Sequence, residues 1–368
     1  MSQPGARERL WWEPRASWGD RLLLAPLGPA EGLFRMAAAA RGALYDAGVF
    51  PSVRAGVPVI SVGNLAVGGA GKTPVVLALA ERLLASGWRA AVLSRGYGAS
   101  RSDDRVVSDG ERVLLDADQA GDEPVLLARR LPGLRVLCGT DRGSLAGKAV
   151  ALGADVLLLD DGFQHRRLRR DLDVVVLDAA NPWGNGHCLP RGPNREPPSA
   201  LRRAGLVWLG HADRASPDAL EELRELARRA TGRSPVESRH APRDLADGRL
   251  DRRFPLQALA GRSVGLLTGV ARPGSVKRTV EGLGADVVAA FAFPDHHPFT
   301  EREVTEAVSA TSRAGGSLLV TTEKDAVRLP AAVAGDERIR VLRIDAEILS
   351  GGQELKAALD RACEGMGR

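Results

Sequence analysis

Short apolar runs alternate with helical stretches along the middle of the chain. The run VPVISV, which begins at Val57, ends in a glycine-rich turn, and a helical stretch from Pro74 to Ser86 follows it. Continuous runs of Leu and β-branched residues between helical stretches are typical of buried parallel strands. The pattern therefore predicts an α/β fold with a mostly parallel sheet and helices on both faces. The further runs of this kind are Ala90–Ser94, Arg135–Gly139, Asp155–Asp161, Asp173–Ala179 and Leu206–Gly210.

A second series of apolar runs follows a stretch rich in Arg, Asp and Glu. That stretch contains a predicted helix, Pro217–Ala230, and we place a domain boundary near residue 235. The expected division is an N-terminal helical arm over 1–50, a larger α/β domain over 51–235 and a smaller C-terminal α/β domain over 236–368. The runs of the second series are Ser263–Gly269, Ala285–Phe291, Ser317–Thr322 and Arg340–Asp345.

The N-terminal arm is apolar but interrupted by proline and charged residues. No stretch reaches the roughly 18 apolar residues that a membrane span needs. Leu33, Ala37, Ala40 and Leu44 follow helical spacing. Trp and Arg beside an apolar helical face are typical of a helix at a membrane interface, and the alternative is a helix packed on the protein's own core. The Trp and Arg residues around this face are Trp11, Trp12, Arg15, Trp18, Arg21, Arg35 and Arg41.

The charge balance changes this picture only slightly. The 368 residues include 51 Lys and Arg against 46 Asp and Glu, a net charge of +5. This mild excess suits a phosphate-bearing substrate or an anionic membrane face, or reflects simple Arg enrichment, and it is too small to indicate nucleic acid. The scattered Cys138, Cys188 and Cys363 and the absence of a signal-peptide pattern predict a reducing compartment.

The strongest local signal is the glycine-rich sequence GNLAVGGAGKTPVV, from Gly63 to Val76. It lies between an apolar strand and a helix, as a phosphate-binding P-loop requires. We expect Lys72 to reach the β- and γ-phosphates and the Thr73 hydroxyl to bind Mg²⁺. The usual pattern has a first glycine where this chain has Ala66. The domain over 51–235 is therefore expected to be P-loop NTPase-like and to bind nucleotide.

Acidic residues follow another predicted strand. DVLLLDDGFQH ends four apolar residues with Asp160 and Asp161, which places both carboxylates at the carboxyl end of a buried strand, where α/β sheets bind ligands. We expect them to hold Mg²⁺, the alternative being an acidic turn. His165, four residues beyond Asp161, is on residue type alone more often structural.

Two further motifs carry titratable residues. In GDEP, Asp122 and Glu123 begin a helical stretch. They have either a chemical role or only that of capping the helix N-terminus. In FPDHHPF, Asp295 and His296 lie between aromatic residues, a pattern compatible with a metal cluster, an acid–base pair or packing. Zinc is not expected, because the sequence has neither H-E-x-x-H nor a third ligand at fixed spacing.

Two other classes of P-loop protein, regulatory GTPases and assembly ATPases, are alternatives. A regulatory GTPase needs an N/T-K-x-D guanine motif, whereas LVWLGHAD has no Lys and TTEKDA has Lys324 and Asp325 adjacent. An assembly or metal-insertion ATPase, or a GTPase, that acts on a protein partner stays as the alternative function.

Seven segments together resemble one family, tetraacyldisaccharide 4'-kinase, which acts in lipid A biosynthesis in Gram-negative bacteria. They stand in that family's order over roughly residues 55 to 330, and the family also lacks the first P-loop glycine. Asn194 departs from the expected Leu. The segments are VPVISVGNLAVGGAGKTP, LSRGYG, GDEP, DDGFQHRRLRRDLDVVVLDA, GNGHCLPRGPNRE, FPDHHPFT and TTEKDAVRL.

The resemblance implies a reaction. The γ-phosphate of ATP passes to the 4'-hydroxyl of a tetraacylated glucosamine disaccharide 1-phosphate, with Mg²⁺ as cofactor. It also implies a peripheral or monotopic enzyme at the cytoplasmic face of the inner membrane, whose N-terminal helix contacts the membrane surface. No nucleic acid and no obligate protein partner are expected.

The resemblance also implies residue roles. Asp122 matches the family's candidate general base and His296 its partner, and if the two lie in different domains, we expect domain closure to bring them together. Glu123 is a further candidate for Mg²⁺ beside Thr73, Asp160 and Asp161. Other candidates near the site are Gln164, His165 and Asp295. The expected nucleotide-binding residues are Ala66, Val67, Gly68, Gly69, Ala70, Gly71, Lys72 and Thr73.

Overall fold

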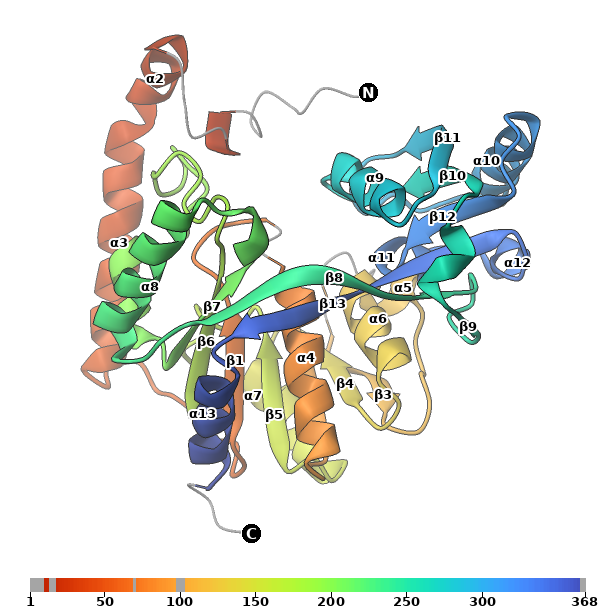
Figure 1. Cartoon of the computed structure of the whole chain (residues 1–368). Coiled ribbons are helices and arrows are strands. Elements are labelled where there is room, and N and C mark those ends of the chain that lie inside the picture. The colour runs from red at the N-terminus through yellow and green to blue at the C-terminus, as the bar shows by residue number, and fades with distance from the viewer. Residues whose placement is uncertain (1–9, 13–17, 69–70, 97–102, 365–368) are drawn as a thin grey trace. The chain divides into compact units, whose positions relative to one another are not determined.

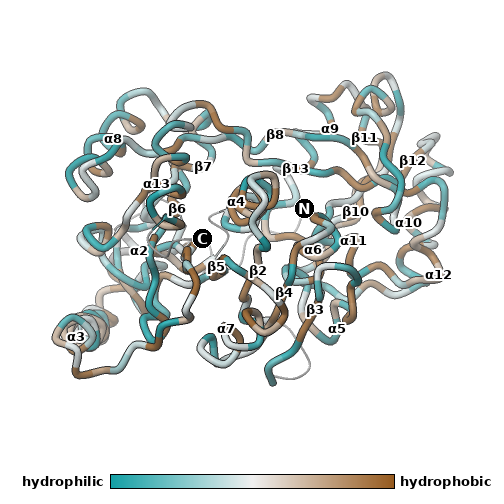
Figure 2. Tube along the Cα trace, turned by 90° about the horizontal axis from the view of Figure 1, so that it is seen from below, coloured by the Kyte–Doolittle hydropathy of each residue, from teal (hydrophilic) through white to brown (hydrophobic). Residues whose placement is uncertain are grey.

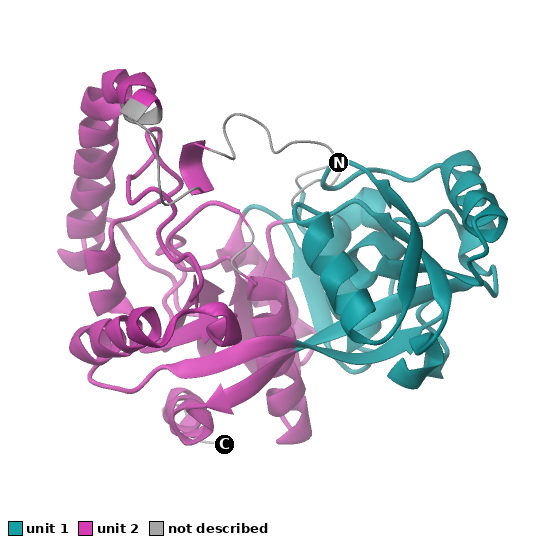
Figure 3. Cartoon of the chain, turned by 45° about the horizontal axis from the view of Figure 1, so that its top comes forward, with its two compact units in different colours: residues 1–2, 96–140, 241–345 teal, residues 3–95, 141–240, 346–368 magenta. Residues whose placement is uncertain are grey.

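The structure, a computed structural model of the chain, describes residues 10–12, 18–68, 71–96 and 103–364. Contacts divide the chain into two units, which Figure 3 colours separately. Unit 1 draws on the ranges 96–140 and 241–345, and unit 2 on 3–95, 141–240 and 346–368.

A parallel sheet lies at the centre of unit 2. Its strands run in the order β8-β7-β6-β1-β5-β2, and all of these pairings are parallel (Figure 1). Strands β1, β2, β5 and β7 are buried along their whole length, which explains their continuous apolar sequences. The bounds are β1 (Val59–Gly63), β2 (Ala90–Ser94), β5 (Val156–Asp160), β6 (Leu172–Asp178), β7 (Leu206–Gly210) and β8 (Val236–Ala246), of which the residues up to 240 belong to unit 2.

Helices cover this sheet on two sides. Helix α4 contacts β1, β2 and β5, α7 contacts β2, α8 contacts β7 and α13 contacts β6. Figure 2 shows α4 and α7 on opposite sides of the strands. Phe163, Val175 and Leu209 belong to a hydrophobic cluster beneath α8. The helices of unit 2 are α2 (Trp18–Leu24), α3 (Gly28–Asp46), α4 (Lys72–Ala85), α7 (Arg142–Ala151), α8 (Pro217–Thr231) and α13 (Gly352–Glu364), with short 3₁₀ helices at Ala25–Leu27, Pro198–Arg203 and Ala212–Arg214.

Unit 1 contains a second parallel sheet and two antiparallel pairs. The parallel order is β11-β10-β12-β13, while β3 pairs antiparallel with β4, and β9 with the end of β8. Val264, Leu318 and Val320 belong to its hydrophobic core. The bounds are β3 (Arg105–Asp109), β4 (Arg135–Cys138), β9 (Arg253–Phe254), β10 (Ser263–Thr268), β11 (Asp286–Ala292), β12 (Leu318–Thr322) and β13 (Ile339–Ser350), whose residues from 346 belong to unit 2.

The helices of unit 1 are short or lie beside the second sheet. Helix α10 contacts β10, β11 and β12, and α9 contacts β11, while α6 contacts β3 and β4. Thr300 caps the start of α10 and Glu303 bonds back to the Thr300 backbone, a capping box. The helices are α5 (Ala117–Ala120), α6 (Asp122–Arg130), α9 (Pro273–Gly282), α10 (Glu301–Arg313), α11 (Glu323–Ala326) and α12 (Ala331–Ala334), with a 3₁₀ helix at Leu256–Leu259.

The predicted fold class is confirmed, and three strands were missed. The polar sequences of β3, β8 and β9 do not form continuous apolar runs, and β4 pairs antiparallel with β3 where a parallel strand was expected. Strand β8 accommodates charge because buried Glu237 accepts hydrogen bonds from Arg224 at 2.7 and 2.9 Å. The linear division into 1–50, 51–235 and 236–368 stays a prediction.

Candidate active site

The P-loop lies between β1 and α4 in unit 2. Gly71 has a φ of +75° and precedes Lys72, the first residue of α4, so the positive end of the helix faces the loop. The start of the loop is held by another segment: the Val67 N–H donates to the Pro193 carbonyl at 2.8 Å. Ala66 forms a bridge with Asn194, and Thr73 is the second residue of α4. Gly69 and Ala70 lie outside the described residues.

Lys72 is held toward the end of β5. Its Nζ lies 3.2 Å from the Asn64 Oδ1 and 3.2 Å from Oδ1 of Asp161. Both partners come from strand ends, one just after β1 and one just after β5, which pair in parallel. The ammonium is thus positioned above the carboxyl edge of the sheet, and its contact with the β- and γ-phosphates stays a prediction.

Asp160 and Asp161 have different surroundings. Asp160 is buried at the end of β5, and its Oδ2 accepts a hydrogen bond from the Ser94 hydroxyl at 3.1 Å. Asp161 has a φ of +52°, and its two oxygens accept from Arg195 at 3.0 and 2.8 Å. Burial opposes ionisation of Asp161, but Lys72 and Arg195 outweigh burial and hold the pKa of this carboxyl below its ordinary value.

Gln164 connects these groups, whereas His165 is set apart from them. The Gln164 amide donates to the Asn64 carbonyl at 3.0 Å and to Glu196 at 3.1 Å. Burial and the nearby Arg142 and Arg170 lower the pKa of His165 to about 4, so its ring is neutral at neutral pH. Within the described structure, its buried Nε2 has no hydrogen-bond partner.

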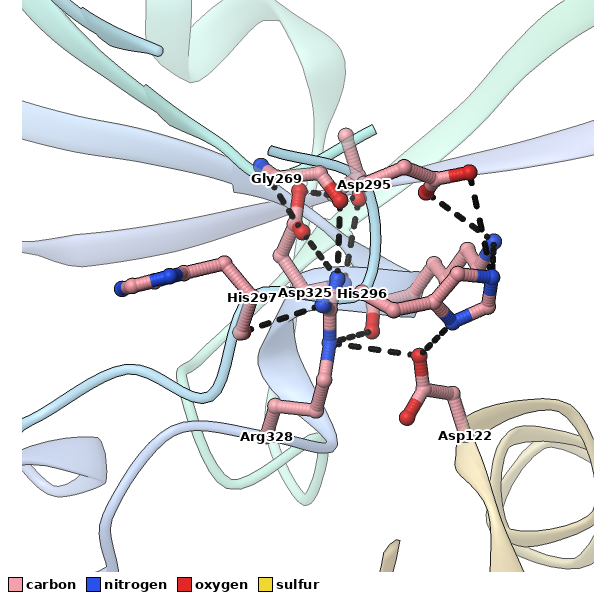
Figure 4. A network of polar contacts seen from close by, with 9 residues as sticks. Asp122, Gly269, Asp295, His296, His297, Asp325 and Arg328 are labelled. Atoms are coloured by element: carbon pink, nitrogen blue, oxygen red, sulfur yellow. Dashed lines mark hydrogen bonds and ion pairs between the residues drawn. The ribbon is translucent and has the colours of Figure 1, made fainter. Parts of the chain in front are cut away.

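A second polar group lies in unit 1 (Figure 4). His296 Nδ1 is 2.8 Å from Asp122 Oδ2, and His296 has a φ of +62°. Lys324 Nζ is 3.2 Å from His296 Nε2 and 3.3 Å from Asp295 Oδ1. An ammonium can only donate, so Nε2 accepts and the ring proton is on Nδ1, where it donates to Asp122.

Arg328 holds the same carboxylate from another side. Its Nε is 3.3 Å from Asp122 Oδ2, and its NH2 lies 2.6 Å from Asp325. Asp325 in turn accepts from the Gly269 N–H at 3.0 Å (Figure 4). Arg328 also donates to the carbonyls of Gly269 and His297, each at 3.0 Å. The loop that carries His296 is thereby tied to α11 and to the end of β10.

Asp122 and His296 form their pair inside unit 1. The expectation that closure between two domains brings them together is therefore wrong, because 96–140 packs with 241–345 in a single unit. Glu123 follows Asp122 on α6 and belongs to unit 1, while Asp160 and Asp161 belong to unit 2. Its predicted role at the metal stays a prediction.

Sequence reasoning missed Arg195, Lys324, Arg328 and Asn64 as members of the two groups. Their motifs GPNRE and TTEKDAVRL were recognised, but nothing in their local pattern shows which side chain turns toward an acid. Asn194, which stands where Leu was expected, is buried and donates to the carbonyls of Trp183 and His187, both at 2.9 Å.

Helix α3 joins unit 2 through polar contacts. Glu31, its buried residue, accepts from the Cys188 N–H at 2.9 Å, and Arg41 donates to the Gln164 carbonyl at 3.1 Å. Large apolar side chains of this region are exposed: Leu22 by 70%, Leu33 by 64% and Met36 by 62%. The helix is thus not packed on a core through its apolar residues.

The described residues contain neither a membrane-spanning helix nor a cluster of His, Cys, Asp and Glu that could hold a metal ion. No helix there is long and apolar enough to cross a membrane. No group of three or more His, Cys, Asp or Glu in that part of the chain could hold a metal ion by itself. Mg²⁺ at a nucleotide site needs only one or two carboxylates, because water and phosphate supply the other ligands.

Comparisons with known proteins agree with one another. The family model for Tetraacyldisaccharide-1-P 4'-kinase matches residues 22–364. A tetraacyldisaccharide 4'-kinase from Anaeromyxobacter sp. (strain Fw109-5) is 64% identical over 356 residues, 96% of this chain and 96% of that protein. One from Syntrophus aciditrophicus (strain SB) is 43% identical over 333 residues, 88% of this chain and 89% of that protein.

A crystal structure is also similar over nearly the whole chain. It is that of LpxK from Aquifex aeolicus in complex with ATP, with 30% sequence identity and a TM-score of 0.77. The match covers 93% of this chain and 99% of that one. Sequence and fold therefore point to the same group of proteins.

Proposed function

The chain belongs to the tetraacyldisaccharide-1-P 4'-kinase family, and from this premise we propose that it transfers the γ-phosphate of ATP to the 4'-hydroxyl of a tetraacylated glucosamine disaccharide 1-phosphate in lipid A biosynthesis. The observation that carries the proposal is the presence of two separate sets of functional residues in one family member. Unit 2 holds a P-loop lysine beside two acids, and unit 1 holds a carboxylate paired with an imidazole. A kinase needs both, whereas an assembly ATPase needs no base for a sugar hydroxyl.

ATP is assigned to the P-loop of unit 2. Gly71, Lys72 and Thr73 stand where a P-loop presents backbone N–H groups, an ammonium and a hydroxyl to phosphates. Asp161 and Asn64 hold the Lys72 ammonium at the loop before nucleotide arrives. The γ-phosphate replaces part of this pairing, because it is the stronger anion in the same place.

The donor set on this edge fits Mg²⁺. The Thr73 hydroxyl and the carboxylates of Asp160 and Asp161 are hard oxygen donors, the kind that this ion prefers. Ser94 orients Asp160 from β2 by its hydrogen bond of 3.1 Å. When bound, the ion would offset the charge that develops between the β- and γ-phosphates.

Asp122 is assigned the role of general base. His296 and Arg328 both approach Oδ2, at 2.8 and 3.3 Å, so Oδ1 is the oxygen that takes the proton of the sugar hydroxyl. As the new P–O bond forms, this proton passes to Asp122 and ADP leaves. His296 and Arg328 fix the orientation of this carboxylate through their contacts with Oδ2.

The N-terminal region is assigned to the cytoplasmic face of the inner membrane, as a peripheral or monotopic contact. Polar residues of α3 bind the body of unit 2, and Leu22, Leu33 and Met36 are left exposed. An apolar surface with Arg residues beside it suits the boundary between headgroups and acyl chains. The exposed apolar residues support this assignment, because a tetraacylated acceptor resides at the same boundary.

The reaction is tested with purified protein, labelled ATP, Mg²⁺ and the tetraacyldisaccharide 1-phosphate in detergent micelles. Label on the lipid with wild type, and its near loss in Lys72→Ala and in Asp122→Ala, is the expected result. Lys148→Ala, which changes an exposed lysine of α7, is the matched control and should keep full activity. ATP binding without any lipid product would overturn the proposal and return attention to a protein-partner ATPase.

Membrane contact is tested separately by sedimentation with vesicles of phosphatidylethanolamine and phosphatidylglycerol. The double variant Leu33→Glu and Met36→Glu should no longer sediment with the vesicles, but it should still bind ATP. Leu349→Glu, which changes an exposed leucine of β13, is the control and should sediment like wild type. Equal sedimentation of both variants would contradict the membrane assignment.

A further inference from the structure

A chain of three polar residues crosses the carboxyl edge of the sheet in unit 2. Asp178 ends β6, His211 follows β7, and His240 lies on β8, and these strands are neighbours in the parallel order (Figure 1). His211 Nδ1 is 3.3 Å from Asp178 Oδ1, and His211 Nε2 is 3.1 Å from His240 Nδ1. Asp178 and His211 are exposed by only 6% and 7%. Asp178 lies in the segment DDGFQHRRLRRDLDVVVLDA and His211 in LVWLGHAD, but neither the motifs nor the proposed chemistry assigns a role to these three residues.

His240, the last of these three residues, lies against the P-loop. A methyl group placed on Gly71 would lie 2.9 Å from His240 Nε2 and 3.1 Å from its Cε1. Such distances are shorter than van der Waals contact, so the imidazole fills the space that a side chain at Gly71 would need. His240 therefore forms a wall against the residue that immediately precedes Lys72.

The backbone of His211 supports an ordered arrangement. His211 has a φ of +53°, a conformation that non-glycine residues seldom adopt and that persists only where surrounding contacts enforce it. Among the described residues, Asp161, Leu250 and His296 share this property, and two of these three, Asp161 and His296, belong to the sites described above. The left-handed turn at His211 directs its ring between Asp178 and His240.

The contacts between these residues orient the two rings. His211 Nδ1 lies 3.3 Å from Asp178 Oδ1, within ion-pair distance, although this nitrogen makes no aligned hydrogen bond in the described structure. Burial, followed by His211 and Arg214, lowers the pKa of His240 to about 3, and its ring is neutral. The 3.1 Å contact between His211 Nε2 and His240 Nδ1 fixes the plane of the His240 ring against Gly71.

We propose that Asp178, His211 and His240 form a positioning relay that holds the P-loop turn at Gly71 in the conformation that receives the phosphates of a nucleoside triphosphate. The relay touches the loop on the side of the Gly71 backbone, so its effect is on phosphate binding and not on the proton transfer at Asp122. It rests on the proposed function in one respect, namely that this P-loop binds ATP.

The first test is the affinity for ATP, measured by titration calorimetry without lipid acceptor. His240→Ala should weaken binding about tenfold, which corresponds to about 1.4 kcal/mol, and leave turnover at saturating ATP within about threefold. His240→Gln, whose amide reaches toward the position of Nε2, should recover part of the affinity. Arg239→Ala is the matched control, because Arg239 is the neighbour on β8 and forms an exposed ion pair with Glu347.

The second test is a double-mutant cycle between Gly71→Ala and His240→Ala. In the wild-type background, the methyl group meets an imidazole that His211 holds in place, so Gly71→Ala should reduce ATP affinity by more than about 30-fold. In the His240→Ala background, the additional loss should be at most about fivefold, because only the strain at positive φ remains. Thermal melting of each sample shows that the variants are folded.

The outcomes separate the relay from the proposed function. If wild type binds ATP, His240→Ala binds it equally and Gly71→Ala costs the same in both backgrounds, the relay is rejected while the kinase assignment stands. If wild type binds no ATP, both are rejected. A lower melting temperature with unchanged ATP affinity identifies the three residues as merely structural and also overturns the proposal. If His240→Ala does not fold, His240→Gln and His211→Asn replace it in the same two measurements.

Discussion

The P-loop of unit 2 and the Asp122–His296 pair of unit 1 are built in opposite ways. The P-loop is one short segment whose shape comes from its backbone, with Gly71 at positive φ and α4 starting at Lys72. The Asp122–His296 pair joins side chains that lie 174 positions apart, and further side chains, Arg328 and Lys324, fix both members. The P-loop is thus a local segment shaped by its backbone. The Asp122–His296 pair brings together residues that are distant in sequence, and side-chain hydrogen bonds hold them.

This difference sets what a substitution does at each site. A change at the P-loop alters how phosphate is bound and therefore affects both ATP affinity and turnover. A change at the Asp122–His296 pair leaves the phosphate contacts intact and removes proton transfer, so it affects turnover alone. Measuring ATP binding and phosphoryl transfer side by side therefore separates the two regions.

The largest effect is expected for Lys72→Ala. If the ammonium contacts the phosphates as proposed, its loss should reduce kcat/KM for phosphoryl transfer by about 10³-fold, the upper range for one preorganised electrostatic group. ATP affinity should fall as well. Steady-state kinetics with labelled ATP, together with calorimetry, measure both quantities. Unchanged affinity and turnover would show that phosphate is not bound at this loop.

Asp122→Asn comes next. The amide keeps the shape and the contact with His296 but cannot take a proton, so kcat should fall by about 10²-fold while ATP affinity stays within about twofold. His296→Ala should cause a similar loss of kcat, and the double variant should lose little more than either single variant because the two act as a unit. Additive losses of kcat would show that Asp122 and His296 act independently.

The contrast also explains what could be predicted from the sequence. Buried parallel strands such as β2 and β7 were predicted to the residue, since their apolar runs match their burial. The P-loop and Asp160–Asp161 were found because each is a contiguous motif at a strand end. Strand β8 was missed because it carries charged residues. The sheet accommodates the charge of Glu237 only because Arg224, which lies on α8, donates hydrogen bonds to it.

The members of the two sites that were missed share one physical reason. Lys324 lies in a recognised motif, yet its contact with His296 depends on how the chain between β11 and α11 folds back. Arg195 likewise reaches Asp161 only because the segment around Pro193 pairs with the start of the P-loop. Spacing along the chain carries no signal for such contacts, since they are fixed by tertiary packing.

A smaller effect is expected for Lys324→Met. The side chain donates to His296 Nε2 and fixes the tautomer that donates to Asp122, so kcat should fall by about tenfold, the value of one hydrogen bond from a charged group. The pH profile of kcat is recorded for both proteins, since the removed ammonium no longer donates to Nε2. Lys277→Met, which changes an exposed lysine of α9, is the control and should behave like wild type. An unaltered rate and pH profile would show that Asp122 and His296 alone make up the working unit.

The smallest effect is expected in the acid unfolding of Asp161→Asn. Because the pKa of Asp161 is lower in the folded protein than in the unfolded chain, its ion pairs with Lys72 and Arg195 stabilise the fold above about pH 3.9. That contribution is lost as the pH falls through the lower pKa of the folded state. Asp161→Asn should therefore reduce the free energy of unfolding by about 1 kcal/mol at pH 7, and the deficit relative to wild type should shrink toward pH 3. Urea unfolding in metal-free buffer at pH 7, 5, 4 and 3 measures this difference. A deficit that stays constant over this range would show that the carboxylate is not held ionised by the two cations, and the P-loop would then depend on its backbone alone.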